Sequence, residues 1–121
     1  MTLYKQTMDA LCRLYIDARL VHADLSEYNI MVVPSDLVDN KFDDGESKDD
    51  VQAILIDLAQ SVDIRHPDSK GLLKRDLERL VSFFRRQGVK TPSVEETLDM
   101  IVTASETKHR AVKHEEYEVD L

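Results

Sequence analysis

Apolar residues recur with helical spacing in three stretches of the chain, which predicts three amphipathic helices. These stretches are residues 2–19, 70–87 and about 93–105. Ser93 and Glu96 fit a capping box at the start of the third helix. Two shorter apolar runs that are rich in β-branched residues, Ile30–Val33 and Val51–Ile56, predict buried strands. The pattern as a whole predicts a mostly helical α+β fold with one small pair of strands.

Polar segments interrupt this pattern at two places. Residues 35–50 hold seven acidic side chains and two lysines, so this segment alone contributes −5 to the net charge of −8. It fails as a calcium loop, because placing Gly45 at the sixth position puts Phe42 at a ligand position. We expect a flexible acidic insertion here. Residues 106–121 form a charged C-terminal tail, for which we expect a frayed or extended helix.

Composition narrows the class of protein. The 121 residues suffice for one domain or for one lobe of a larger one. The single cysteine, Cys12, excludes an internal disulfide and reads as a small core residue of the first helix. No apolar run reaches the roughly 20 residues of a membrane helix. The net charge of −8 argues against attraction of the whole surface to nucleic acid or anionic membrane.

The candidate chemistry lies between the first predicted helix and the first predicted strand. Asp24 and Asn29 are five positions apart there, the Asp-x-x-x-x-Asn layout of a phosphoryl-transfer catalytic loop. In such a loop the aspartate accepts or orients the proton of the attacking hydroxyl, and the asparagine holds a metal ion. His22 is predicted to be a buried brace of this loop. His66, which precedes a proline, is predicted to stabilise a turn.

Antiparallel pairing of the two strands would complete the site. Asn29 precedes the first strand and Asp57 follows the second, so pairing brings them to one end of the hairpin, with Asp24 close by. Hard oxygen ligands of this kind suit Mg²⁺, which takes one or two carboxylates and completes its shell with water and phosphates. The sequence therefore predicts a magnesium site built from distant parts of the chain.

These motifs resemble those of the RIO family of atypical protein kinases, in the branch of its first and third members. The matching stretches are Leu20–Asn29, Ile56–Val62 and His66–Pro67, followed by Leu73, Asp76 and the pair Phe83 and Phe84. The resemblance covers roughly residues 1–103. It implies that Asp24 is the catalytic aspartate and that Asn29 and Asp57 bind the metal. It also implies that Asp57 can accept phosphate as an aspartyl-phosphate intermediate, which is reasonable for a carboxylate.

The resemblance further implies the reaction and its setting. ATP and Mg²⁺ would be the cofactors, and the phosphoryl group would pass to a protein Ser or Thr or to Asp57. The partner would be a maturing small ribosomal subunit in the cytoplasm, with no membrane and no sequence-specific reading of nucleic acid. The protein would act more as an ATP-driven switch than as a kinase of many substrates.

Two departures from the family pattern shape the remaining expectations. The acidic insertion replaces a short turn, at the far end of the hairpin from the metal site. No glycine-rich loop or strand lysine precedes Asp24, so residues 1–105 are expected to be a C-terminal lobe alone, from a fragment or a truncated gene model, and inactive by itself. The alternatives are a non-catalytic module that docks on the ribosome and a small-molecule kinase of the aminoglycoside or choline type.

Overall fold

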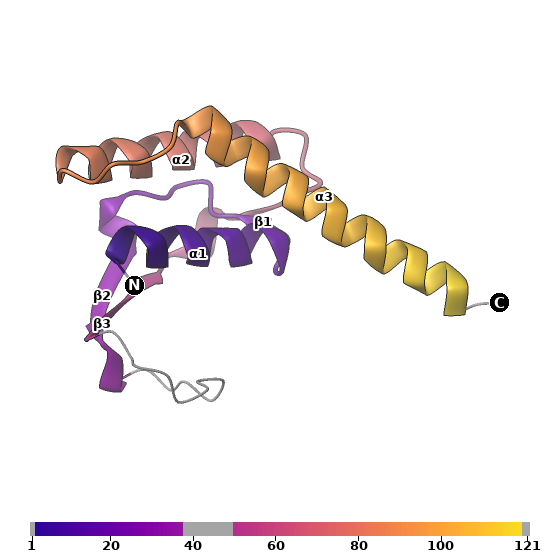
Figure 1. Cartoon of the computed structure of the whole chain (residues 1–121), viewed down its shortest axis with the longest axis horizontal. Helices are drawn as coiled ribbons and strands as arrows, with labels where there is room; N and C mark the ends of the chain where they lie inside the picture. Colours follow the sequence, from indigo (N-terminus) through magenta and orange to yellow (C-terminus); the bar gives the residue numbers. More distant parts are fainter. Residues whose placement is uncertain (1, 38–49, 120–121) are drawn as a thin grey trace.

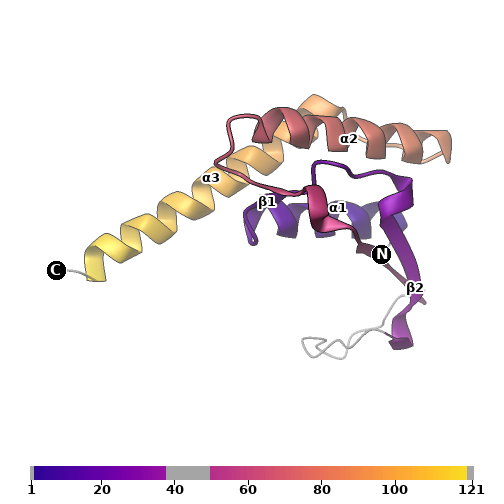
Figure 2. The same ribbon diagram turned by 180° about the vertical axis from the view of Figure 1, so that it is seen from behind.

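The computed structural model describes residues 2–37 and 50–119 as ten short and long elements (Figure 1). In chain order these are α1 (Leu3–Ile16), β1 (Leu20–Val21), the 3₁₀ helix η1 (Glu27–Asn29), β2 (Ile30–Pro34), η2 (Ser35–Leu37), β3 (Val51–Leu55), η3 (Leu58–Gln60), β4 (Val62–Asp63), α2 (Ser69–Arg86) and α3 (Val94–Val119). The loop that joins β1 to η1 runs between α1 and α2 in both views (Figures 1 and 2). The expected α+β class is confirmed.

Caps and left-handed backbone conformations mark the ends of the first two helices. Thr2 caps α1 by accepting the N–H of Lys5 at 3.2 Å. The helix stops three residues before the predicted end, and Arg19 then takes a left-handed backbone with φ 59°. Gly88 follows α2 with φ 87°, while its N–H and that of Val89 bond back into the last turn at 3.0 Å. This paired hydrogen bonding is a Schellman motif, and it confirms Gly88 as the predicted helix stop.

The third helix continues to residue 119, which confirms the helix expected for most of the charged tail. Ser93 accepts the N–H of Glu96 at 3.1 Å, so the hydroxyl half of the predicted cap is formed. α3 then continues past residue 105 to Val119, without a glycine or proline to break it. Lys108 pairs with Asp17 at the end of α1. Beyond that contact, α3 projects past the other elements in both views (Figures 1 and 2).

The hairpin has the predicted antiparallel register but not the predicted burial. β2 and β3 pair from Ile30 opposite Leu55 to Pro34 opposite Val51. Met31 and Val32 nevertheless keep 47% and 49% of their surface exposed. The expectation of buried strands was wrong, because α1 contacts β3 but nothing among the described residues covers the rest of this two-stranded sheet. β1 and β4 form a second short pair that the pattern did not predict.

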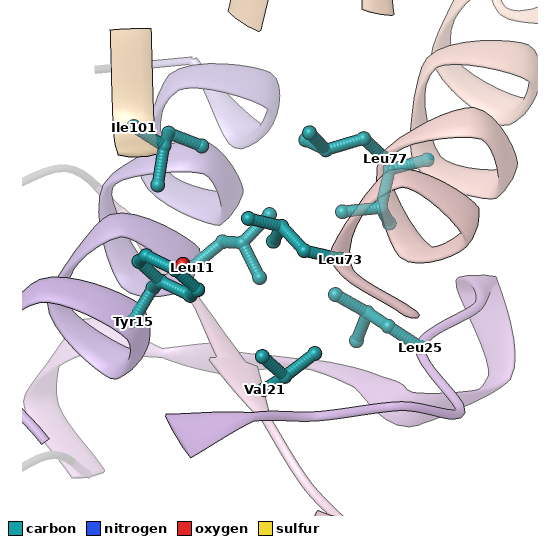
Figure 3. Packing of buried hydrophobic residues seen from close by; sticks show 8 residues of the cluster. Leu11, Tyr15, Val21, Leu25, Leu73, Leu77 and Ile101 are labelled. Atoms are coloured by element: carbon teal, nitrogen blue, oxygen red, sulfur yellow. The ribbon is translucent and has the colours of Figure 1, made fainter. Parts of the chain in front are cut away.

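One core joins the helices to the loop (Figure 3). It comprises Leu11, Tyr15, Val21, Leu25, Leu73, Leu77, Leu80 and Ile101. Leu25 lies in the loop directly after Asp24 and is fully buried, so the same packing that stabilises the fold anchors the loop. Cys12 packs partly buried against this core, and burial raises the pKa of its thiol, which fits a structural role.

The acidic insertion is described only at its two ends. Its first residues form η2, in which Ser35 is buried. Residues 38–49, including Phe42 and Gly45 of the calcium-loop test, lie outside the described residues. None of the described helices is both long and apolar enough to cross a membrane.

Candidate active site

A buried carboxylate on α2 holds the backbone of the predicted catalytic loop. Asp76 is fully buried, and its two oxygens accept the N–H of Ala23 at 2.9 Å and of Leu25 at 3.0 Å. These two residues flank Asp24. Ala23 has a left-handed backbone with φ 72°, a conformation that a β-carbon disfavours. The two hydrogen bonds therefore fix an otherwise unfavourable turn and set the direction of Asp24.

The protonation of Asp76 reflects two opposing effects. Burial raises the pKa of its carboxyl, because a charge is less stable away from water. The N–H donors of Leu25 and Ala23, and the nearby guanidinium of Arg75, lower the pKa in part. Burial prevails, so the net shift is upward.

Two arginines of the same helix reach the loop. Arg75 donates to the carbonyl of Ala23 at 2.5 Å. Arg79, one turn further along α2, lies 3.4 Å from Oδ1 of Asp24, and both side chains are about half exposed. An ion pair this exposed is weak. The Asp24 carboxylate therefore stays accessible to solvent.

His22 links the catalytic loop to the strand that carries the second acid. Its ring is fully buried. Nδ1 accepts the N–H of Asp24 at 3.2 Å, and Nε2 lies 2.7 Å from the carbonyl of Ile56. A carbonyl only accepts, so Nε2 carries the proton and the ring is neutral. The predicted bracing role is confirmed, and the brace ends one residue before Asp57.

Asn29 closes the catalytic loop and begins the hairpin. Its side-chain Nδ2 donates to the carbonyl of Asp24 at 2.5 Å. Its backbone carbonyl accepts the N–H of Ile56 at 2.9 Å. The structure thus joins Asn29 directly to Asp24, and it places Asn29 one position from Asp57 across the hairpin. The predicted meeting of the three residues at one end of the hairpin is present in the backbone.

Asp57 combines a left-handed backbone with an exposed side chain. It adopts the left-handed region with φ 61° and ψ 68° and precedes η3 without capping it. Aspartate tolerates this region better than most residues. Its carboxylate is exposed and has no hydrogen bond or ion pair within the described residues. Asn29 is half-buried, and its Oδ1 likewise has no hydrogen bond among the described residues, because its amide nitrogen is the atom used toward Asp24.

These free oxygens fit a magnesium ion. One carboxylate and one amide oxygen are hard donors, and Mg²⁺ commonly takes few protein ligands and keeps its remaining positions for water and phosphate oxygens. No group of three or more His, Cys, Asp or Glu side chains able to hold a metal occurs in residues 2–37 and 50–110. A site that depends on phosphates to complete its shell is consistent with both observations.

Sequence reasoning named the candidate acids but missed the residues of α2 that hold the loop. Asp76 was noted only as part of the family resemblance. Its signal was its position on the apolar stripe, between Leu73, Leu77 and Leu80, where a charge needs specific partners. Arg75 and Arg79 gave no such signal, because arginines on an exposed helix face are common. His66 accepts the N–H of Asp68 at 3.0 Å, which confirms its predicted role in a turn.

Comparisons with known proteins agree with this geometry. The family model described as "RIO domain" matches residues 1–39 and 47–97. The chain is 37% identical over 91 residues, 75% of its length, to "Serine/threonine-protein kinase RIO3" of Caenorhabditis elegans, of which it covers 14%. It is 35% identical over 89 residues, 74% of its length, to "RIO-type serine/threonine-protein kinase Rio1" of Thermoplasma acidophilum, of which it covers 38%.

A solved structure shares the fold. It is "Crystal structure of the Rio2 kinase-ADP/Mg2+-phosphoaspartate complex" from Chaetomium thermophilum, with a TM-score of 0.57 at 22% identity. The superposition covers 93% of this chain and 39% of that one. The chain spans well under half the length of each of these relatives. The family match covers most of the chain and favours this family over the small-molecule kinases, so the chain belongs to the RIO domain family.

Proposed function

We propose that this chain carries the catalytic base and the metal ligands of a RIO-type, ATP-dependent protein kinase or ATPase. The observation that carries this proposal is the pair of links around Asn29, whose side chain bonds to Asp24 and whose backbone bonds to Ile56. These links put a base, an amide oxygen and a second acid at one end of the hairpin. Phosphoryl transfer needs little covalent chemistry from the protein, so positioning of this kind supplies much of the catalysis.

Each residue has a separate role in the proposed reaction. Asp24 accepts the proton of a Ser or Thr hydroxyl as the hydroxyl oxygen bonds to the γ-phosphorus and ADP leaves. Asn29 and Asp57 supply oxygen ligands to the metal. Mg²⁺, when bound, neutralises the charge that develops on the phosphate oxygens. His22, Arg75 and Asp76 hold the loop in place.

Asp57 can also act as the phosphoryl acceptor itself. A carboxylate oxygen can displace ADP from the γ-phosphorus, which gives an acyl phosphate that water then hydrolyses. The solved Rio2 kinase is a complex with ADP, Mg²⁺ and phosphoaspartate, which supports this route for the family. The exposed Asp57 carboxylate, without a partner in the described residues, is available for the same step.

The biological setting is proposed from the family resemblance alone. We infer that the protein acts in the cytoplasm on maturing small ribosomal subunits. A ribosome-docking module without catalysis is the competing function. The phosphoryl-transfer assay described next distinguishes it from a kinase or ATPase.

The test uses the longest expressible form of the protein, with ATP, Mg²⁺ and a protein acceptor. Asp24→Asn should lower the rate of phosphoryl transfer by about 10²- to 10⁴-fold and leave ATP binding nearly unchanged, because the base acts on the hydroxyl. Asp57→Asn should also weaken metal-dependent ATP binding. The control is Asp68→Asn, an exposed aspartate whose side chain caps nothing, which should leave both measurements unchanged. Equal losses of ATP affinity and turnover in Asp24→Asn would contradict the assigned role.

A further inference from the structure

Two adjoining pockets form a groove along the outer face of α2. The first, of about 400 Å³, begins at Ser26 and Glu27 of the catalytic loop and continues along the helix to Arg86. The second, of about 450 Å³, continues to Val94 at the start of α3. Both pockets are lined by Glu78, Ser82 and Arg86, so they adjoin. We call this continuous surface the α2 groove.

We propose that the α2 groove docks an acidic segment of the protein that receives the phosphoryl group. This proposal rests on the proposed function, because it places the acceptor beside Asp24. Four arginines and two glutamates line the groove, in a chain whose net charge is −8. The groove is therefore a cationic surface on an acidic protein, which an acidic partner would find by electrostatic attraction.

The arginines differ in how free they are to bind a ligand. Arg85 is engaged with Thr91 at 2.8 Å and with the carbonyl of Pro92 at 3.2 Å. Arg75 is engaged with the catalytic loop. Arg86 has no partner among the residues whose side chains the structure describes. Arg79 has only its long, exposed contact with Asp24, which a substrate carboxylate can replace.

The spacing of the two available arginines defines the ligand. Arg79 and Arg86 are seven positions apart, so they share a face of α2 about 10 Å apart along its axis. An extended peptide covers that distance in about three residues. A hydroxyl at Asp24 therefore has an acidic neighbour at Arg79 and a second acid about three positions further along. Binding of the first acid would also release the Asp24 carboxylate from Arg79.

The same lining disfavours a nucleic acid as the occupant. Glu27 and Glu78 face the groove and would repel a continuous phosphate backbone, whereas separate peptide carboxylates can avoid them. No aromatic side chain is among the described residues that line either pocket, so bases would have no stacking platform. We therefore commit to a protein segment with spaced acids.

The test measures peptide binding without nucleotide, by fluorescence anisotropy. The probe is a labelled peptide with a central serine and aspartates one and four positions away on both sides. The comparison peptide has asparagine at those four places. The acidic peptide should bind about fivefold tighter or more, and added salt should remove the difference.

Charge reversal locates the binding surface. Arg86→Glu should weaken binding of the acidic peptide by about fivefold or more, whereas Arg86→Lys should keep most of it. Lys5→Glu is the matched control, because Lys5 is an exposed residue of α1 outside the groove. A peptide with lysines in place of the aspartates should bind better to Arg86→Glu than to the wild type. Equal binding of the acidic and asparagine peptides, or equal effects of Arg86→Glu and Lys5→Glu, would overturn the proposal.

Two further arms separate this proposal from others. Single-stranded RNA that displaces the acidic peptide at lower concentration than the unlabelled peptide does would overturn the choice of occupant. Asp24→Asn should bind the peptide as well as the wild type or better, because Arg79 is released. Peptide binding without phosphoryl transfer would leave the groove assigned and refute the proposed function. Phosphoryl transfer by a protein that binds both peptides equally would refute the proposed docking groove and leave the proposed function standing.

Discussion

The side chain that most determines the shape of the catalytic loop is Asp76, and removing it should unfold the loop and much of the chain with it. Asp76→Ala leaves the buried N–H groups of Ala23 and Leu25 without an acceptor. Hydrogen bonds to a charged group contribute about 1.5–3 kcal/mol each, which gives roughly 3–6 kcal/mol for the two. The unfavourable burial of the carboxylate offsets part of this, so we expect a net loss of about 3–5 kcal/mol.

Asp76→Asn is the finer version of the same perturbation. The amide has one carbonyl oxygen, so it can accept one of the two N–H groups, and its NH₂ then faces the other. One buried donor is left unsatisfied, which costs about 1–3 kcal/mol. This variant should stay folded under conditions in which Asp76→Ala does not, because domains of this size have only about 5–15 kcal/mol of stability.

Urea unfolding followed by far-ultraviolet circular dichroism measures both losses. Amide hydrogen exchange at Ala23 and Leu25 reports the loop separately. Glu78→Gln is the matched control, since Glu78 is an exposed carboxylate on the same helix, and it should change stability by no more than about 0.5 kcal/mol. The reasoning is refuted if Asp76→Ala costs less than about 1 kcal/mol, or if exchange at the two amides stays as slow as in the wild type.

Two further predictions concern proton binding and backbone geometry. Burial raises the pKa of Asp76, so the folded chain binds this proton more tightly than the unfolded chain. The stability that the folded chain gains by binding this proton is complete below the ordinary pKa of aspartate. It is lost as the pH rises through the pKa of Asp76 in the folded chain. Urea titrations at increasing pH should therefore show that the stability advantage of wild type over Asp76→Asn narrows between the unfolded and the folded pKa of Asp76. An advantage that widens with pH would show that the N–H donors outweigh burial. Gly88→Ala should destabilise the chain by about 1–2 kcal/mol through its left-handed backbone, whereas Gly71→Ala, within α2, should stabilise it by about 0.5–1 kcal/mol. Neither added methyl would meet another atom within 4 Å, so equal thermal shifts in the two variants would refute this explanation.

Sequence periodicity predicted the elements that pack on one another. The stripe through Leu73, Leu77 and Leu80 is the buried face of α2. The antiparallel pairing of β2 and β3 was predicted from a single hairpin connection. The same pairing places Asn29 beside Ile56. These features succeed because each depends on local spacing or on a single pairing.

Other features depend on what surrounds an element, and spacing does not reveal that. Met31 and Val32 are both apolar, which predicts burial. They are nevertheless exposed, because nothing in the described chain fully covers their sheet. The continuation of α3 beyond residue 105 fits the helix expected for the tail, although the apolar stripe itself ends near residue 105. It follows helix-forming residues and a contact between Lys108 and the end of α1.

The most informative omission concerns the candidate site itself, because the motif named its acids and not the residues that hold them. Asp24 is positioned by contacts to the loop from His22, Arg75, Asp76 and Arg79. Apart from the bond of His22 to Asp24, these contacts join residues 34 to 55 positions apart. No short motif contains such a set, so the motif alone does not specify the geometry that orients Asp24.

The same separation ties the chemistry of the loop to the stability of the whole chain. Leu25 is buried in the core between β1 and α2, and its N–H is held by Asp76. A loop fixed from one side by packing and from the other by a buried carboxylate cannot open without exposing both. Exchange of the Ala23 and Leu25 amides should therefore require nearly global unfolding, unlike most loop amides. A loop with that property keeps Asp24 oriented before any ligand binds, which is the preorganisation that the proposed phosphoryl transfer needs.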